Sequence, residues 1–289
     1  MKNLQIALIN NIFTDKISVY DRGLSYGDGF FETMRWTITK EKIPKVEFWS
    51  RHIKRLTNSC KIAKIKIPTL SLLNSYKLKI LNKAKQKEIK EGILKIIITR
   101  GTGGRGYRFD KEIEPTIIFL SFPVQAYQSS FYKKGIKVEF CKNLLSKNFL
   151  LRGLKHLNRV DSVLLSDEID MKGNFEGLVL DENNNIVEGM MSNIFFINKK
   201  KLFTPEINFV GIQGIMRQVI IEKFAHLFDK VIIEPINKKR LNTFDFAFLT
   251  NSIMGVMPVR KIEDFFYKIS PIVYHMNSEL KKKNFLELN

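Results

Sequence analysis

Apolar positions change their period along the chain, and the period predicts which segments are strands and which are helices. Residues 1–10 predict a first strand, and apolar runs of strand length follow at four further places. Apolar residues at helical spacing alternate with these runs, over residues 47–63 and 73–86. The four strand-like runs are residues 17–20, 30–38, 93–99 and 116–120.

The second part of the chain repeats this mixture. A helix is predicted over residues 157–172, with Gly173 as its stop, and another is predicted after Gly214. Turn chemistry at residues 181–184 predicts a hairpin between two apolar runs. Further strands are predicted at residues 134–141, 194–197, 201–203 and 247–250.

Polar and turn residues interrupt the pattern at residues 123–130, which predicts an interdomain linker. A chain of 289 residues is also long enough for two domains of ordinary size. We therefore expect an N-terminal α/β domain over residues 1–122 and a C-terminal domain over residues 131–289. The fold class expected is mixed α/β (α+β).

Composition narrows the class of protein. The apolar fraction of 44% is typical of a globular protein, and no run approaches the roughly 20 apolar residues that span a bilayer. The N-terminus lacks the cleavage site of a signal peptide. Two cysteines, Cys60 and Cys141, give no disulfide framework. We expect a cytoplasmic protein without a membrane partner.

A net charge of +19 raises the possibility of a nucleic-acid partner. The lysines are spread over the whole chain, and their runs fall at turns or termini, where solvated charge is the ordinary explanation. No zinc-ligand spacing or RNA-binding aromatic signature accompanies them. We expect no nucleic-acid partner and no metal, and a basic surface also attracts multiply anionic substrates.

The segment Gly101-Thr102-Gly103-Gly104-Arg105-Gly106 fits the G-x-G-x-x-G pattern of dinucleotide-binding folds. That fold requires a helix directly after the glycines, whereas Tyr107 and the residues after it, including Pro115, open none. A flexible hairpin loop is the alternative interpretation.

Lys155 and Glu188 carry the chemistry that stands out. A lysine can form a Schiff base with an aldehyde, and a carboxylate at the end of a buried hairpin can hold a protonated ring nitrogen. Each residue also has an ordinary explanation, as a solvated lysine and as a charge at a hairpin end. Their surroundings favour the chemical interpretation. Lys155 begins the run Lys155-His156-Leu157-Asn158-Arg159, and Glu188 lies five residues before Asn193.

These two segments resemble the motifs of the class IV aminotransferase family, the fold-type IV pyridoxal phosphate enzymes. Three further segments match the family in the same order, from about Asp21 to Val259: residues 21–33, 99–107 and 214–217. The resemblance implies a two-domain, D-amino acid aminotransferase-like fold. It also implies pyridoxal 5'-phosphate as cofactor and a homodimer in which residues 99–107 reach the neighbouring subunit's site.

The resemblance assigns a role to each site residue. Lys155 is the catalytic residue that binds the cofactor covalently and moves protons, and Glu188 pairs with its pyridine nitrogen. Cofactor phosphate is assigned to Arg55 and to the backbone amides of Ile215 and Met216, at a predicted helix start. Many relatives have a threonine hydroxyl where this chain has Met216. The remaining assignments are Arg105 and Tyr107 to substrate carboxylates and Asn251 to substrate or cofactor.

Fold alone does not choose among the family's reactions. Residues 103–107, the helix start at Gly214 and Asn251 resemble the lyase branch, a carbon–oxygen lyase that converts 4-amino-4-deoxychorismate to 4-aminobenzoate and pyruvate for folate biosynthesis. This small anionic substrate is the partner we expect. The alternatives are a branched-chain or D-amino acid aminotransferase, and a non-catalytic basic binding protein on the same scaffold.

Overall fold

The computed structural model describes residues 5–124, 127–144, 148–171, 173–207 and 210–282. The chain divides into two compact units. The first holds the described residues up to 124 together with Lys155–Asn158, and the second holds the remaining described residues. The expected domains and the linker at residues 123–130 remain predictions, and residues 125 and 126 of that linker lie outside the described residues.

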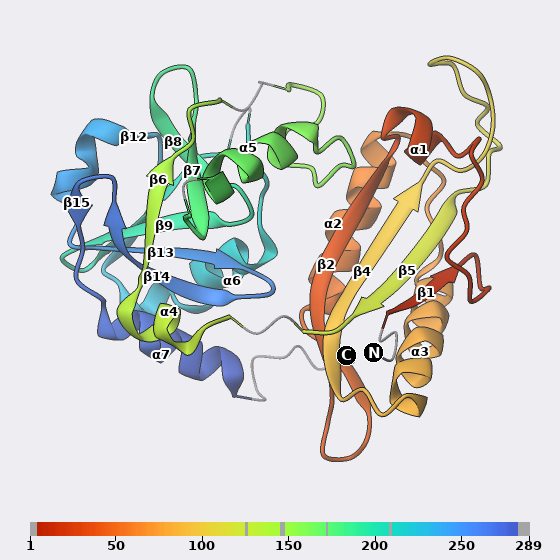
Figure 1. Cartoon of the computed structure of the whole chain (residues 1–289), viewed down its shortest axis with the longest axis horizontal. Coiled ribbons are helices and arrows are strands. Elements are labelled where there is room, and N and C mark those ends of the chain that lie inside the picture. Colours follow the sequence, from red (N-terminus) through yellow and green to blue (C-terminus); the bar gives the residue numbers. More distant parts are fainter. Residues whose placement is uncertain (1–4, 125–126, 145–147, 172, 208–209, 283–289) are drawn as a thin grey trace. The chain divides into compact units, whose positions relative to one another are not determined.

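A five-stranded sheet in the order β1-β5-β4-β2-β3 forms the centre of the first unit as described, and its strand pairs are antiparallel (Figure 1). The predicted N-terminal strand and the strands predicted at residues 30–38, 93–99 and 116–120 are confirmed as β1, β2, β4 and β5. The elements are β1 (Ile6–Ile9), α1 (Arg22–Tyr26), β2 (Gly29–Ile38), β3 (Pro44–Val46), α2 (Trp49–Ile62), α3 (Leu70–Gln86), β4 (Glu91–Thr99) and β5 (Thr116–Phe122).

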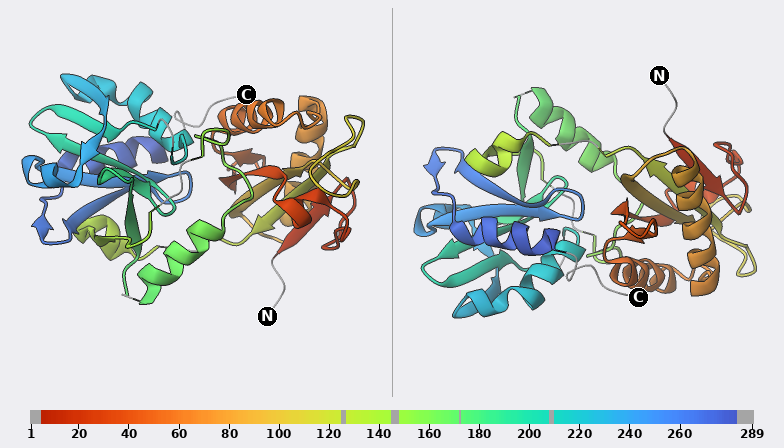
Figure 2. Two further views of the ribbon diagram at one scale, coloured as in Figure 1. Left: turned by 90° about the horizontal axis from the view of Figure 1, so that it is seen from above. Right: turned by 90° about the horizontal axis from the view of Figure 1, so that it is seen from below.

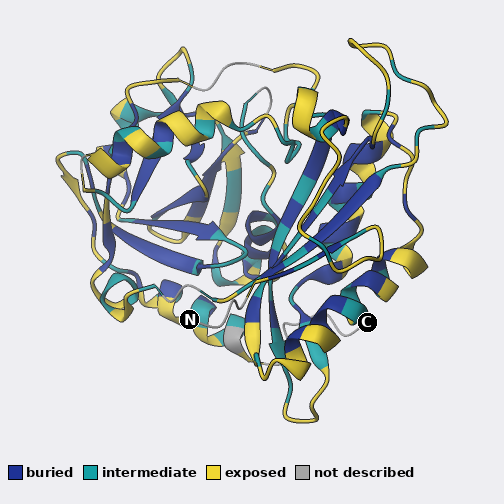
Figure 3. Ribbon diagram, turned by 45° about the vertical axis from the view of Figure 1, so that its right-hand side comes forward, coloured by how far each residue is buried: buried dark blue, intermediate teal, exposed yellow. Residues whose placement is uncertain are grey.

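Helices α2 and α3 cover one face of this sheet, and Figure 2 gives two further views of them. Trp49 of α2 and Tyr76 of α3 both pack on Phe119 of β5, which places both helices on the face to which Phe119 points. Along β2, buried residues alternate with partly exposed ones (Figure 3). The alternation follows from strand geometry, in which successive side chains point to opposite faces.

The second unit contains the larger sheet, with strands in the order β11-β10-β9-β13-β14-β6-β7-β8-β12 and β15 paired to β14 among the described residues. The predicted hairpin is confirmed as β7 and β8. The elements are α4 (Ser129–Lys134), β6 (Ile136–Phe140), α5 (Val160–Met171), β7 (Glu176–Leu180), β8 (Asn185–Gly189), β9 (Asn193–Asn198), β10 (Lys201–Pro205), α6 (Ile215–Lys223), η1 (Ala225–Leu227), β11 (Lys230–Glu234), β12 (Ile236–Asn237), η2 (Lys238–Thr243), β13 (Phe246–Asn251), β14 (Gly255–Ile262), β15 (Phe265–Phe266) and α7 (Pro271–Lys281).

Strand β9 shows how this sheet is packed. Its residues are almost all buried, and successive side chains belong to different apolar clusters. Ile194 and Phe196 pack in one cluster, and Phe195 and Ile197 pack in the other. A strand covered on both faces needs a continuous apolar run rather than an alternating one. None of the helices in the described part of the chain is long and apolar enough to cross a membrane.

Two predicted elements differ from the structure. Residues 17–20 form no strand, because the Asp21 amide bonds back to the Ser18 carbonyl and closes a turn that leaves Val19 and Tyr20 exposed. The helix expected from residue 157 begins at Val160, since the Leu157 amide donates to the Gly29 carbonyl of β2. A local turn bond decides the first case, and a bond to a strand distant in sequence decides the second.

A buried carboxylate fixes the turn between β8 and β9. Glu176 is fully buried on β7, and its carboxylate accepts hydrogen bonds from the Ser192 hydroxyl at 2.9 Å and the Gly177 amide at 3.1 Å. Burial raises the pKa of Glu176 to about 7, against the opposing effect of these bonds and of the Met190 and Met191 amides. A Cβ on Gly189 would lie 2.3 Å from Ser192 Oγ, so the turn excludes larger residues there.

The raised pKa of Glu176 predicts a pH-dependent stability. Between pH 4.5 and about 7 the folded protein retains a proton that the unfolded chain has lost, so the free energy of unfolding falls as pH rises. The variant Glu176→Gln lacks this titration. Over that window we expect its stability relative to the wild type to rise by up to about 3 kcal/mol, measured by urea unfolding across pH.

Glu182→Gln, in the exposed turn of the same hairpin, is the matched control and should change little with pH relative to the wild type. A stability difference for Glu176→Gln that stays constant from acid to neutral pH would contradict the assignment of this titration to Glu176.

Candidate active site

Lys155 is held by backbone pairing with β2 in the first unit. The Phe31 amide donates to the Lys155 carbonyl at 3.0 Å, and the Leu157 amide donates to the Gly29 carbonyl at 3.0 Å. Phe30 and His156 form the antiparallel bridge between these bonds. The segment that carries the predicted catalytic lysine is therefore an added piece of sheet rather than a free loop, although the chain before and after it belongs to the second unit.

The Lys155 side chain extends over an aromatic ring of β2. Its Nζ lies 4.4 Å from the centroid of the Phe31 ring, a distance at which a cation interacts with the π face. The positive charge of Lys155 also contributes to lowering the pKa of His52, after the larger effect of burial. Lys155 and His52 are therefore close enough to interact electrostatically.

Arg55 lies in a network with Glu32 and His52. Arg55 Nε donates to Glu32 Oε1 at 2.7 Å, and Arg55 Nη2 donates to Glu32 Oε2 at 2.6 Å. His52 Nδ1 lies 2.6 Å from Glu32 Oε2. This two-point ion pair fixes the guanidinium of the arginine that the sequence assigns to the cofactor phosphate, because it sets both position and plane.

The protonation states of this network follow from its burial and charges. Burial by itself would raise the pKa of Glu32, but Arg55 and His52 outweigh it and lower the pKa to about 2. Burial lowers the pKa of His52 in spite of the neighbouring Glu32. A neutral His52 then donates Nδ1–H to the carboxylate, while its buried Nε2 has no hydrogen-bond partner among the described residues.

Sequence analysis did not identify Glu32 or His52. The sequence did contain a signal for Glu32. It is a charged residue at a position of β2 whose side chain, by the alternation of the strand, faces the helices. His52 follows the helical period of α2, but only the packing of α2 against β2 shows that His52 and Glu32 are in contact.

Glu188 lies in the second unit, where two neighbours orient it. Its Oε2 accepts hydrogen bonds from the Ile212 amide at 2.9 Å and from Asn193 Nδ2 at 3.2 Å. Gly211, with φ of +92°, brings the backbone close, since a Cβ there would lie 3.2 Å from Glu188 Oε2. The carboxylate is thus buried, ionisable and fixed in direction.

Helix α6 begins beside this group. Its N-cap is Gly214, at which a Cβ would lie 2.0 Å from Asn193 Oδ1. The first amides of a helix have no intrahelical acceptor and suit an anion. The amides of Ile215 and Met216 are at this start, while both side chains are buried. The predicted helix terminus is confirmed, and its contact with phosphate remains a prediction.

The side-chain amide of Asn251 is hydrogen-bonded to backbone groups of its own unit. Its Nδ2 donates to the Met191 carbonyl at 3.1 Å, and its Oδ1 accepts from the Ile253 and Met254 amides, each at 2.8 Å. It therefore joins the end of β13 to the turn between β8 and β9, which Glu176 also fixes. The predicted contact of Asn251 with cofactor or substrate remains a prediction.

The loop with Arg105 and Tyr107 projects from the first unit between β4 and β5 (Figure 1). Both residues are exposed, Tyr107 to 88%. The backbone of Gly106 is anchored, because its amide donates to the Tyr26 hydroxyl at 2.9 Å and its carbonyl accepts from Arg22 Nη1 at 3.1 Å. No helix follows the glycines within residues 101–115, which excludes the dinucleotide interpretation.

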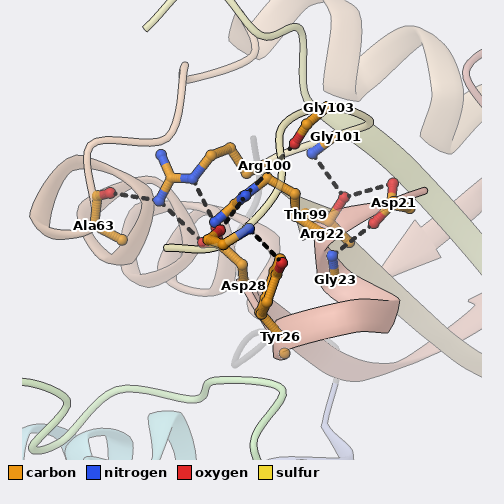
Figure 4. Close-up of polar contacts among 12 residues, drawn as sticks. Asp21, Arg22, Gly23, Tyr26, Asp28, Ala63, Thr99, Arg100, Gly101 and Gly103 are labelled. Carbon is orange, nitrogen blue, oxygen red and sulfur yellow. Dashed lines mark hydrogen bonds and ion pairs between the residues drawn. The ribbon is translucent and has the colours of Figure 1, made fainter. Parts of the chain in front are cut away.

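A buried charge cluster supports that anchor (Figure 4). The Asp28 carboxylate accepts hydrogen bonds from Arg22 Nε at 3.1 Å and from Arg100 Nε at 2.7 Å. Arg100 Nη2 also donates to the Ala63 carbonyl at 2.9 Å, which links the start of the loop to the end of α2. The segment that the sequence singled out at residues 21–33 therefore positions the loop.

Comparison with known proteins gives relatives over most of the chain. An aminodeoxychorismate lyase from Vibrio harveyi is 29% identical over 254 residues, covering 88% of this chain and 90% of the relative. A putative branched-chain-amino-acid aminotransferase from Methanocaldococcus jannaschii is 30% identical over 262 residues, covering 88% of this chain and 87% of the relative. The crystal structure of 4-amino-4-deoxychorismate lyase from Pseudomonas aeruginosa is similar with a TM-score of 0.84 and 30% identity, covering 96% of this chain and 98% of that one.

These similarities agree with the mixed α/β architecture, and solved structures of fold-type IV enzymes share it. The family model for amino-transferase class IV matches residues 29–262, which includes both Lys155 and Glu188. The protein therefore belongs to the amino-transferase class IV family.

Proposed function

We propose that this protein is a pyridoxal phosphate-dependent lyase that converts 4-amino-4-deoxychorismate into 4-aminobenzoate and pyruvate for folate biosynthesis. The observation that carries the proposal is Lys155, which backbone bonds to β2 hold in place with its Nζ over Phe31. The similarity to lyases from Vibrio harveyi and Pseudomonas aeruginosa over most of the chain supports the choice of reaction.

The residues present fit the cofactor. Glu188 is an oriented, buried carboxylate of the kind that a protonated ring nitrogen requires. The α6 amides of Ile215 and Met216 supply donors for a phosphate in the second unit. The resemblance to the family adds the positive charge of Arg55, a residue of the first unit. Lys155 supplies the amine for the covalent bond. When bound, the cofactor supplies an electron sink for the carbon that carries the substrate amine.

Lys155 then has two tasks in the reaction. Its Nζ takes the proton from the amine-bearing carbon of the substrate, acting as a base. As the carbon–oxygen bond to the enolpyruvyl group breaks and the ring becomes aromatic, the same nitrogen gives the proton to the departing group. The products are then 4-aminobenzoate and pyruvate, and no external oxidant is needed.

The substrate carboxylates would be held by Arg105 and Tyr107, which the anchored loop presents to solvent. A guanidinium suits this task because it binds carboxylates with two parallel hydrogen bonds. We propose that this loop serves the site of a second copy in a homodimer. The two cysteines, both free and buried, fit the cytoplasmic location that we propose.

An aminotransferase acting on branched-chain or D-amino acids is the second candidate, favoured by the 30% identity to the Methanocaldococcus jannaschii relative. It would use the same Lys155 but return the proton to the cofactor's own carbon. Incubation with D-alanine or a branched-chain amino acid separates the two, since only the aminotransferase would convert the cofactor to its amine form.

The first test combines activity with chemical trapping. Purified protein should release 4-aminobenzoate, followed by its fluorescence, and borohydride should fix the cofactor on Lys155 in peptide mapping. Lys155→Ala should lose at least about 10³-fold in kcat, because it removes the base that moves the proton. The exposed Lys137→Ala should keep wild-type activity.

Transamination without release of 4-aminobenzoate would establish the second candidate in place of the lyase. A label on another residue, or no label at all, would refute the site, and the latter result is what a non-catalytic binding protein would give.

The second test concerns Glu188. Glu188→Gln keeps the shape but removes the negative charge that stabilises a protonated ring nitrogen, so we expect kcat to fall by about 10²–10³-fold with the cofactor still trapped on Lys155. Glu182→Gln is the charge-matched control on the same hairpin and should retain full kcat. An unchanged kcat in Glu188→Gln would remove this residue from the cofactor site.

A further inference from the structure

The turn between β8 and β9 lies directly between two residues of the candidate site. Glu188 is the last residue but one of β8, and Asn193 is the first residue of β9. The Gly189 amide donates to the Ser192 carbonyl at 2.7 Å and closes the turn. Asn193 Nδ2 donates to Glu188 Oε2 at 3.2 Å. The direction of the Glu188 carboxylate therefore depends on the shape of the turn.

Asn193 has little freedom to move. Its Nδ2 also donates to the Ile212 carbonyl at 3.0 Å, and the Ile212 amide donates to the same oxygen of Glu188 at 2.9 Å. On the other side, a Cβ on Gly214 would lie 2.0 Å from Asn193 Oδ1. Closely packed groups transmit a displacement instead of absorbing it. A change in the turn would therefore reach Glu188 through Asn193.

Glu176, the first residue of β7, holds this turn in place. Its side chain is fully buried, and its Oε2 accepts a hydrogen bond from the Ser192 hydroxyl at 2.9 Å. Hydrogen bonds from the Met190 and Met191 amides also favour its ionised form. A Cβ on Gly189 would lie 3.1 Å from Glu176 Cδ. The carboxylate therefore lies against every residue of the turn.

Among the described residues, the groups that face Glu176 are uncharged. Its partner in β6 is Val138, its own strand presents the Gly177 amide at 3.1 Å, and the turn presents amides and a hydroxyl. Burial raises the pKa of Glu176 to about 7, and the hydrogen bonds oppose this rise. The titration of Glu176 near neutral pH is thus set by its burial and by the turn that it binds.

We propose that Glu176 is a positioning residue for the cofactor: its ionised carboxylate fixes the turn so that Asn193 directs Glu188 at the ring nitrogen, and a proton on Glu176 weakens that hold. This inference rests on the proposed function, because it takes Glu188 to pair with that nitrogen. A carboxylate has two strong acceptor oxygens, whereas a carboxylic acid has one and adds an O–H donor. The amides of the turn can only donate, so the neutral acid binds them less well.

Two substitutions change the titration of Glu176 in different ways. Glu176→Gln keeps the size of the side chain but is neutral at every pH, so it resembles the protonated wild type. Ser192→Ala removes a hydrogen bond that lowers the pKa of Glu176, so the carboxyl should ionise at a higher pH. The matched controls are Glu182→Gln, in the exposed turn of the β7–β8 hairpin, and Ser121→Ala, which removes a buried hydroxyl in the first unit.

The experiment measures the affinity of the apoenzyme for pyridoxal 5'-phosphate, by quenching of tryptophan fluorescence, from about pH 5.5 to about 8.5. The ratio of dissociation constants, variant over wild type, cancels pH effects that both proteins share. For Glu176→Gln we expect this ratio to rise from about 1 at the acid end to about 10 at the alkaline end, since only the wild type gains the ionised carboxylate. Ser192→Ala should tighten its binding at a higher pH than the wild type, and both controls should keep a ratio of about 1.

Stability distinguishes this role from simple support of the fold. Over the same pH range, the free energy of unfolding of Glu176→Gln should rise relative to the wild type, because the ionised wild-type carboxylate is costly to bury. Its affinity for the cofactor should fall relative to the wild type over that range. If Glu176 only supported the fold, relative stability and relative affinity would change in the same direction.

A double-mutant cycle tests the route through Glu188. In the Glu188→Gln background, Glu176→Gln should weaken cofactor binding by less than about 2-fold at the alkaline end, because the carboxylate that it directs is gone. A loss of about 10-fold in both backgrounds would mean that Glu176 acts independently of Glu188, and it would overturn the inference.

The outcomes separate this inference from the proposed function. If the wild type releases 4-aminobenzoate but the ratio for Glu176→Gln is flat across pH, the role of Glu176 is wrong and the lyase stands. If the ratio rises as expected but no 4-aminobenzoate forms, the positioning role stands and the lyase is wrong. If Glu176→Gln does not fold, Ser192→Ala decides, and binding that tightens at the wild-type pH overturns the inference. A wild type that does not bind the cofactor overturns both.

Discussion

The pairing of Lys155–Leu157 with the first residues of β2 is the constraint on which the candidate site depends. A lysine that must hold a cofactor and also move a proton needs a fixed Cα, because its side chain has four rotatable bonds of its own. Two backbone hydrogen bonds to Gly29 and Phe31 provide this. They are independent of side-chain identity, so the position of Lys155 is set by the sheet rather than by the residues around it.

The alternation of β2 then divides the work between its two faces. Glu32 points to the helices, where it holds His52 and Arg55, and Phe31 points away from them, toward Lys95 and Lys155. A slip of one residue in the register of β2 would exchange these faces and place the charged Glu32 among the lysines. The same strand therefore couples the stability of the first unit to the geometry around Lys155.

Much of the fold could be predicted because its signals are local. The alternation of β2, the period of α2 and the turn chemistry between β7 and β8 each lie within one segment, and each predicted element formed. The strand expected at residues 17–20 is wrong because a polar turn at Ser18 outweighed its apolar residues.

The candidate site divides in the same way. Lys155 and Glu188 could be named because their motifs are contiguous in sequence, and resemblance to a family gave them roles. The contacts among Glu32, His52 and Arg55, and the approach of Lys95 to Phe31, join segments far apart in the chain. They depend on sheet register and on how α2 packs against β2, and no period within a single segment contains that information.

The hydrogen-bonding capacity of Asn251 limits what its side chain can do in catalysis. A primary amide has two N–H donors and one carbonyl acceptor with two lone pairs. Two backbone amides already occupy the acceptor, and the Met191 carbonyl takes one donor. At most one N–H is left for a ligand, so Asn251 can contribute a single hydrogen bond to an anion. A cation binds a carboxylate more strongly than a neutral amide does, and Arg105 of the loop between β4 and β5 carries such a cation.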